Sequence, residues 1–147
     1  MRRTIALVLS VAVTLFLASG VPAQCLPPNI TATVANPNVP IGTDLVVDYV
    51  TPRHFNGKYL YTLSSFWAGS TPIGGGYCLP LSPPFYLLGA SYVAANKARF
   101  RLTIPKDRSL VGLNVYVAGI VADGTPAGTG ASNGVLVHIR LEDWPLP

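Results

Sequence analysis

A strict alternation of apolar and polar side chains over residues 98–104 constrains the fold of this chain more than any other feature. The apolar residues Ala98, Phe100, Leu102 and Ile104 recur at every second position, and Arg99 and Arg101 stand between them. Because successive side chains of a β-strand point to opposite faces, this pattern predicts a strand with one buried face. A shift of one residue would bury two arginines, so the register of this strand is strongly set.

The same period of two recurs through much of the chain. The segments that show it are residues 30–35, 45–50, 59–63, 85–93, 113–119 and 135–141. Within the second of them, Leu45, Val47 and Tyr49 share one face. Turn signals such as Asn56-Gly57 separate the segments, and no stretch after residue 23 has a helical period. We therefore predict an all-β fold of about seven strands, a two-sheet β-sandwich of immunoglobulin-like or fibronectin-like type, with a small closed barrel as the alternative.

The first residues have the pattern of a secretory signal peptide. Two arginines precede an uncharged apolar run over residues 5–18, and small residues at 21–23 suit cleavage before Gln24. The run is shorter than the roughly 20 residues that a membrane-spanning helix needs. We predict a signal peptide at residues 1–23 and one domain at residues 24–147. The mature domain is expected to be secreted, extracellular or periplasmic, without a membrane span.

Two cysteines, Cys25 and Cys78, lie within the predicted mature domain. In an exported protein a pair of thiols is most simply explained by one disulfide, and two unpaired buried thiols are the alternative. A bridge closing a loop of roughly 50 residues would stabilise the fold by about 3 to 4 kcal/mol on the chain-entropy model.

The charge of the chain is modest and scattered. The formal net charge of +4 falls to +2 when Arg2 and Arg3 leave with the predicted signal peptide. Nucleic-acid binding requires clustered positive charge, so nucleic acid is not among the predicted partners. One outward row of cations, Lys97, Arg99 and Arg101, is interpreted as protection of an edge strand against aggregation.

The sequence contains no recognisable pattern for catalysis, metal binding or cofactor binding. It lacks Gly-x-Ser-x-Gly, His-Glu-x-x-His, Cys-x-x-Cys and a phosphate loop. Asp44 and Asp48 would stand about 13 Å apart along a strand, too far for a paired-carboxylate site. A calcium ion on Asp123 is a minor alternative. We predict no catalytic residues, no metal and no cofactor. The enzymatic alternative is a small secreted hydrolase that joins His54 or His138 to an aspartate.

Aromatic residues gather around a long connection at residues 68–84. This connection holds Gly74, Gly75 and Gly76 together with Cys78, and we interpret it as a flexible loop pinned by the disulfide, with a binding loop as the alternative. Exposed aromatic rings nearby would form a platform that stacks against the apolar faces of sugars. The candidate binding residues are Trp67, Tyr77, Tyr59 and Tyr61.

The carboxy-terminal half carries two short motifs. Residues 104–119 read Ile-Pro-Lys-Asp-Arg-Ser-Leu-Val-Gly-Leu-Asn-Val-Tyr-Val-Ala-Gly, and residues 131–135 read Ala-Ser-Asn-Gly-Val. They resemble the pattern IPND-SLVGL-LY-QA followed by LSN-L-VTI in a group of short secreted bacterial β-domain proteins, although Lys106 replaces the usual Asn and Val117-Ala118-Gly119 the usual Gln-Ala. The resemblance covers most of residues 30–139. It implies export and a β-domain, and it carries no assigned activity or catalytic residue.

These features favour a non-catalytic exported module. Its expected role is surface attachment, envelope structure or contact with a glycan or protein, and the predicted partners are an extracellular polysaccharide or an envelope protein. A histidine within about 3 Å of a carboxylate and close to a serine or threonine would favour the hydrolase instead.

Overall fold

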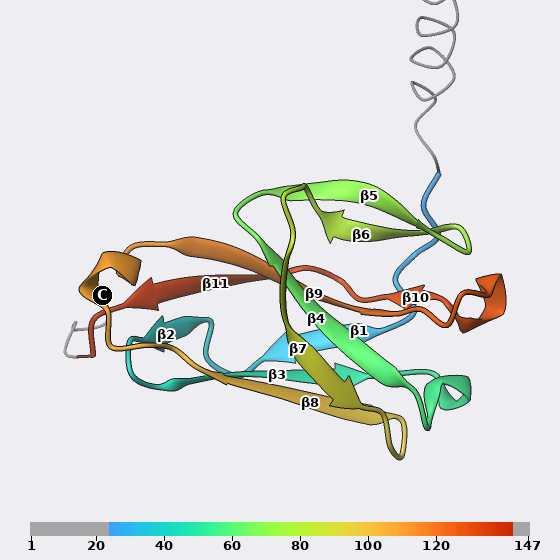
Figure 1. The fold of residues 1–147 in the computed structure, drawn as a ribbon, viewed down its shortest axis with the longest axis horizontal. Helices are drawn as coiled ribbons and strands as arrows, with labels where there is room; N and C mark the ends of the chain where they lie inside the picture. Colours follow the sequence, from blue (N-terminus) through green and yellow to red (C-terminus); the bar gives the residue numbers. More distant parts are fainter. Residues whose placement is uncertain (1–23, 143–147) are drawn as a thin grey trace, which may run out of the picture.

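The computed structural model describes residues 24–142 and has an all-β fold (Figure 1). The predicted signal peptide lies outside the described residues. The strands are β1 (Thr31–Val34), β2 (Asn38–Pro40), β3 (Asp44–Val50), β4 (Tyr59–Ser65), β5 (Ala68–Gly74), β6 (Tyr77–Leu81), β7 (Tyr86–Tyr92), β8 (Lys97–Thr103), β9 (Asn114–Val121), β10 (Gly130–Ala131) and β11 (Val135–Arg140). The short 3₁₀ helices are η1 (Arg53–Phe55), η2 (Arg108–Leu110) and η3 (Pro126–Gly128). Within residues 24–142, no helix has the length and apolar character needed to cross a membrane.

The strands form three sheets. The smaller main sheet has the order β1-β3-β8, and the larger has the order β2-β11-β9-β4-β7 with β10 beside β9. The third sheet is the hairpin β5-β6, which lies above the larger sheet in Figure 1, on the side away from β3 and β8. Strand neighbours pair antiparallel, except that β2 runs parallel to β11.

Strand β8 has the predicted orientation. Phe100 is buried, and so is Ile104, which follows the last residue of β8. Arg99 and Arg101 are exposed. On the neighbouring strand β3, the three side chains predicted to share a face are also buried, namely Leu45, Val47 and Tyr49. The two main sheets meet in one core formed by Ile30, Ala32, Val39, Ile41, Leu45, Val47, Tyr49, Phe55, Leu60, Val93, Ala98, Phe100, Ile104, Val117, Val121, Val137 and Ile139. The all-β class of the fold is thus confirmed.

The cations of β8 lie on an edge strand, and two of them pair with carboxylates across to β3. Arg99 Nε lies 2.6 Å from Asp48 Oδ1, and Arg101 Nη1 lies 3.5 Å from Asp44 Oδ2. These pairs are solvent-exposed, so they contribute little to the free energy of folding. They make the outer face of strands β3 and β8 a polar surface.

The described residues contain eleven strands rather than about seven, and the main difference lies in residues 68–84. The prediction of a flexible loop there is wrong, because the segment forms the hairpin β5-β6. The glycines are needed at its turn: Gly74, Gly75 and Gly76 have φ values of 107°, 60° and 83°, a backbone that side chains disfavour. Two leucines of β6 are buried with Ala118 of β9 in a second core. The hairpin therefore covers part of the outer face of the larger sheet.

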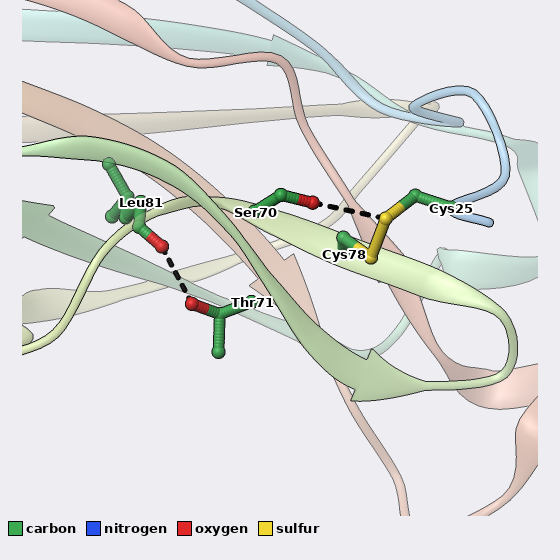
Figure 2. Close-up of a disulfide and its surroundings, with 5 residues drawn as sticks. All are labelled: Cys25, Ser70, Thr71, Cys78 and Leu81. Carbon is green, nitrogen blue, oxygen red and sulfur yellow. Dashed lines mark hydrogen bonds between the residues drawn. A yellow bond between two sulfur atoms is a disulfide. The ribbon is translucent and has the colours of Figure 1, made fainter. Parts of the chain in front are cut away.

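The predicted disulfide between Cys25 and Cys78 is confirmed, with 5.4 Å between the two Cα atoms (Figure 2). It ties the segment before β1 to strand β6. The Ser70 hydroxyl donates a hydrogen bond of 3.1 Å to Cys25 Sγ, and the backbone N–H of Leu26 donates one of 2.8 Å to the Gly76 carbonyl. The segment before β1 is therefore held to the hairpin by a covalent bond and a backbone hydrogen bond.

The buried phenol of Tyr49 is the most perturbed titratable group of the core. Its ring fits beside Gly119 of β9, where a Cβ atom would come within 2.6 Å of it, and its hydroxyl shares a 3.0 Å hydrogen bond with Thr62. Burial disfavours the phenolate and raises the pKa of Tyr49 to about 12.

We expect this phenol to make the fold sensitive to alkali. Because the folded-state pKa of Tyr49 lies above the unfolded value of about 10, its contribution is complete below pH 10 and is lost as the pH rises through about 12. Between these values the free energy of unfolding, measured in urea, should fall by about 2 kcal/mol more in the wild type than in Tyr49→Phe. Equal slopes for the two proteins would contradict this assignment.

Candidate functional site

The four candidate binding aromatics lie in three places rather than on one platform. Tyr59 and Tyr61 lie on the outer face of β4, while Trp67 follows the other end of that strand. Since β4 spans about 20 Å, Trp67 is far from Tyr59. Tyr77 begins β6 next to the disulfide and is half-buried. Of the four, the structure brings together Tyr59 and Tyr61.

A third tyrosine joins this pair from the neighbouring strand. Tyr92 of β7 lies directly opposite Tyr59, and the two ring centroids are 5.7 Å apart in an edge-to-face arrangement. Both residues are 57% exposed. Tyr61 lies opposite Ala90, whose small side chain leaves the ring open. Tyr59, Tyr61 and Tyr92 are called the tyrosine face below. The hairpin β5-β6 covers the opposite end of β4, so these rings stay uncovered.

Tyr92 was not among the candidate binding residues of the sequence analysis. The alternation of residues 85–93 indicates that Tyr92 points outward, but its neighbour Tyr59 is set by the pairing of β4 with β7. About thirty residues separate Tyr59 from Tyr92 in the sequence. That pairing depends on the whole sheet, and no local pattern reports it.

A groove of about 500 Å³ runs from the tyrosine face onto the β3–β8 sheet. It is lined by Asp48, Tyr49, Val50, Tyr92, Lys97, Ala98 and Arg99, and is called the Asp48–Arg99 groove. Arg99 binds the Asp48 carboxylate through two hydrogen bonds, 2.6 Å from Nε and 3.3 Å from Nη2. The hydrogen bond to Asp48 raises the pKa of the Arg99 guanidinium. Two of the five guanidinium N–H donors are used in this pair, and the carboxylate retains further acceptor sites.

The tyrosine face and the Asp48–Arg99 groove combine two kinds of contact in one place. Aromatic rings present flat apolar surfaces, and the carboxylate and guanidinium offer hydrogen-bond acceptors and donors at the edge of one ring. Binding sites for small polar molecules commonly pair an apolar surface with a few fixed polar groups. The arrangement suits a ligand with both C–H faces and hydroxyl groups.

A second aromatic group consists of Phe66, Trp67 and Tyr86. Phe66 contacts Trp67 with 6.1 Å between ring centroids, and Tyr86 with 6.0 Å. Phe66 and Tyr86 also line an apolar cleft between the two main sheets. No local sequence pattern predicts this cleft, because its lining comes from strands that are distant in the sequence.

His54 and Asp123 lie in the same depression of the surface. This depression is open, has a volume of about 520 Å³ and is also lined by Lys58 and Thr125. The Asp123 carboxylate accepts hydrogen bonds from Lys58 Nζ at 2.6 Å and from Thr125 Oγ1 at 2.6 Å. These donors, that of Lys58 above all, hold the pKa of Asp123 well below its usual range. A carboxylate so stabilised is a weak base.

Neither histidine is hydrogen-bonded to a carboxylate in the part of the chain that the structure describes. The ring of His54 is exposed and contacts Phe55, with 4.2 Å between centroids. His138 Nδ1 is hydrogen-bonded to the amide oxygen of Asn114. The geometry stated above as the mark of a hydrolase is therefore not formed within residues 24–142.

The described residues also contain no group of three or more His, Cys, Asp and Glu side chains that could hold a metal ion. Asp123, the residue considered for calcium, uses its two carboxylate oxygens for Lys58 and Thr125. The Lys58 ammonium group, 2.6 Å from the Asp123 carboxylate, would repel a cation placed there.

Comparisons with known proteins add little to this geometry. No protein-family model matches the chain, and no curated protein matches it. Among solved structures it is similar to an alkylpurine DNA glycosylase of Pseudomonas fluorescens bound to DNA containing an abasic site analog, at 12% sequence identity and a TM-score of 0.31. The match covers 80% of this chain and 32% of that chain, so this chain spans about a third of the glycosylase. A likeness of this degree assigns neither a fold family nor an activity.

Proposed function

We propose that this chain is an exported, non-catalytic β-module that attaches to neutral polysaccharide at a cell surface or envelope. The observation that carries the proposal is the pair of exposed rings of Tyr59 and Tyr92, 5.7 Å apart on adjacent strands and continuous with a polar groove. Each ring offers an apolar face to the C–H face of a pyranose, and the groove offers partners for its hydroxyls.

The charges in the groove favour a neutral ligand. Asp48 and Arg99 neutralise each other, which leaves Lys97 as the one unbalanced charge among the residues that line the groove. A polyanion such as a nucleic acid would require a cluster of cations instead. A neutral glycan needs only hydrogen bonds and stacking, and the groove and the tyrosine face offer both.

Export and the finer fold class belong to the same proposal. The disulfide supports an oxidising compartment, since such bonds persist outside the cytosol. Two main sheets that share one core support an immunoglobulin-like or fibronectin-like sandwich. A sandwich of this kind, with aromatic side chains on one outer face, is suited to surface attachment.

Removing the paired rings should weaken glycan binding. We expect wild-type protein to be retarded in native gels containing a soluble β-1,4-glucan, β-1,3-glucan or mannan. Tyr59→Ala/Tyr92→Ala should weaken the affinity for the retarding polysaccharide by roughly tenfold or more, because two stacking surfaces are lost. Both side chains are exposed, so the stability of the variant should stay within about 0.5 kcal/mol of the wild type.

Two control variants locate the effect. Tyr59→Phe/Tyr92→Phe keeps both rings and should retain most of the binding. Trp67→Ala changes a ring at the other end of β4 and should leave retardation unchanged. Retardation that survives the double alanine substitution but disappears with Trp67→Ala would overturn the assignment of the site, and an unretarded wild type would overturn the proposed function.

A further inference from the structure

The cleft between the two main sheets has a continuous apolar lining. Its volume is about 380 Å³, within the range of small-molecule sites. The residues that line it are Leu45, Ser64, Phe66, Tyr86, Leu88, Leu102, Ile104, Leu110, Leu113, Val115, Val117, Val137 and Ile139. None of these side chains is charged.

The one aliphatic hydroxyl of the lining is already used by the fold. Ser64 Oγ donates a 3.5 Å hydrogen bond to the carbonyl oxygen of Tyr86. A buried water requires two to four polar partners, and a sugar requires partners for several hydroxyls. Because the interior of the cleft offers so few, water and sugars are poor occupants, and the buried part of a ligand must be apolar.

The extent of the lining across the larger sheet is sufficient for an extended chain. The lining of the cleft crosses four neighbouring strands, β11, β9, β4 and β7. Four strands are separated by three spacings of about 4.8 Å, so the lining is about 14 Å wide across the sheet. Its volume corresponds to roughly twelve groups of about 30 Å³, the share of one water molecule in the liquid. A methylene group is of similar size, so a chain of about a dozen carbons matches both measures.

Aromatic side chains mark the entrance. Phe66 and Tyr86 line the cleft and are 41% and 48% exposed, so they connect its interior with solvent. A ligand with one polar end could keep that end in water beside these rings. Its apolar part would then lie against the side chains of both sheets.

We propose that this cleft binds the acyl chain of a fatty acid or lipid. The acyl chain is the ligand chemistry that combines the length, the apolar character and the single polar end that the cleft accommodates. This site is separate from the tyrosine face, since no residue of that face lines it. The two proposals can therefore fail independently.

Calorimetric titration of the full chain with dodecanoic acid, kept as a monomer in solution, tests the proposal directly. The expected result is one molecule bound per chain. Co-sedimentation with phosphatidylcholine vesicles forms the second arm, which tells whether the bound acyl chain comes from a free fatty acid or from a membrane lipid. Binding to the free acid, to the vesicles or to both supports the site. Binding in neither arm overturns it.

Variants that fill the cleft distinguish the site from non-specific adsorption. Val115→Phe places a larger side chain in the cleft and should weaken the affinity for dodecanoic acid by roughly tenfold or more, while the far-UV circular dichroism stays that of the wild type. Leu113→Trp serves the same purpose should Val115→Phe fail to fold. Arg101→Ala, on the exposed face of β8, and Tyr59→Ala/Tyr92→Ala should bind as the wild type does. Equal affinity in the filled and unfilled proteins would overturn the proposal.

Discussion

Replacing both cysteines by serine is expected to lower the free energy of unfolding by about 4 kcal/mol. Cys25 and Cys78 are 53 positions apart, and closing a loop of that length removes conformational entropy from the unfolded chain in proportion to the logarithm of its length. For a domain of this size the loss should lower the thermal midpoint by roughly 10–20 °C. Urea unfolding of the variant and the wild type at equal pH measures it.

The matched control for the disulfide is Ser70→Ala. This change removes the hydroxyl that donates to Cys25 Sγ and leaves the covalent bond in place. It should cost about 1 kcal/mol or less, since the hydrogen bond is exposed. Adding a reductant to the wild type should reproduce the effect of the double serine variant. Unfolding curves that do not respond to reductant would contradict this account.

Truncating Phe100 to alanine should cost about 3 to 5 kcal/mol. The side chain is 6% exposed and belongs to the core shared by the two main sheets. Its ring also lies against Gly89 of β7, where a Cβ atom would approach within 2.9 Å of it. Removing the ring loses the apolar transfer energy and leaves a cavity between the sheets. Urea unfolding of the variant measures the loss.

Arg101→Ala on the same strand is the matched control for Phe100→Ala. Arg101 points away from the core, and its side chain is 61% exposed. Its ion pair with Asp44 has a distance of 3.5 Å and is open to solvent, so its loss should change stability by less than about 1 kcal/mol. A similar cost for the two variants would contradict the alternating burial of β8.

The parts of the fold that the sequence predicts well are those set by local alternation. Arg99 and Phe100 point to opposite faces as expected, because a reversed register would place a charge in the core. The pairing of Cys25 with Cys78 could be predicted because the chain contains two cysteines and both follow the predicted cleavage site. Such features depend on neighbouring residues or on simple counts.

The hairpin β5-β6 was missed because its composition hides its pattern. Pro72 and Pro80 lie inside the two strands, and proline ordinarily argues against a strand. A two-stranded hairpin has two open edges, so each proline can face away from its partner. Leu79 and Leu81 lie on either side of Pro80, and this spacing of two is the part of the pattern that indicates a buried face.

The candidate site was only partly predictable for a different reason. Tyr59 and Tyr61 are candidates because they are aromatic residues near residues 68–84, but Tyr92 meets them through the pairing of β4 with β7. Likewise, the apolar cleft is lined by both main sheets and exists only once they are assembled. Surfaces and cavities that depend on strand order require contacts that are distant in sequence, and a single sequence does not encode these in a local pattern.

The position of the disulfide has a mechanical consequence. Cys25 precedes β1, so a tensile load applied to the chain before Cys25 passes through the sulfur atoms directly to strand β6. The stretch between the two cysteines is then shielded from extension, although it contains strands β1 to β5. At about 3.5 Å per residue this withholds roughly 180 Å of contour length until the bond is reduced. In a module that holds a surface under shear, only the part of the chain after Cys78 would thus unfold and extend.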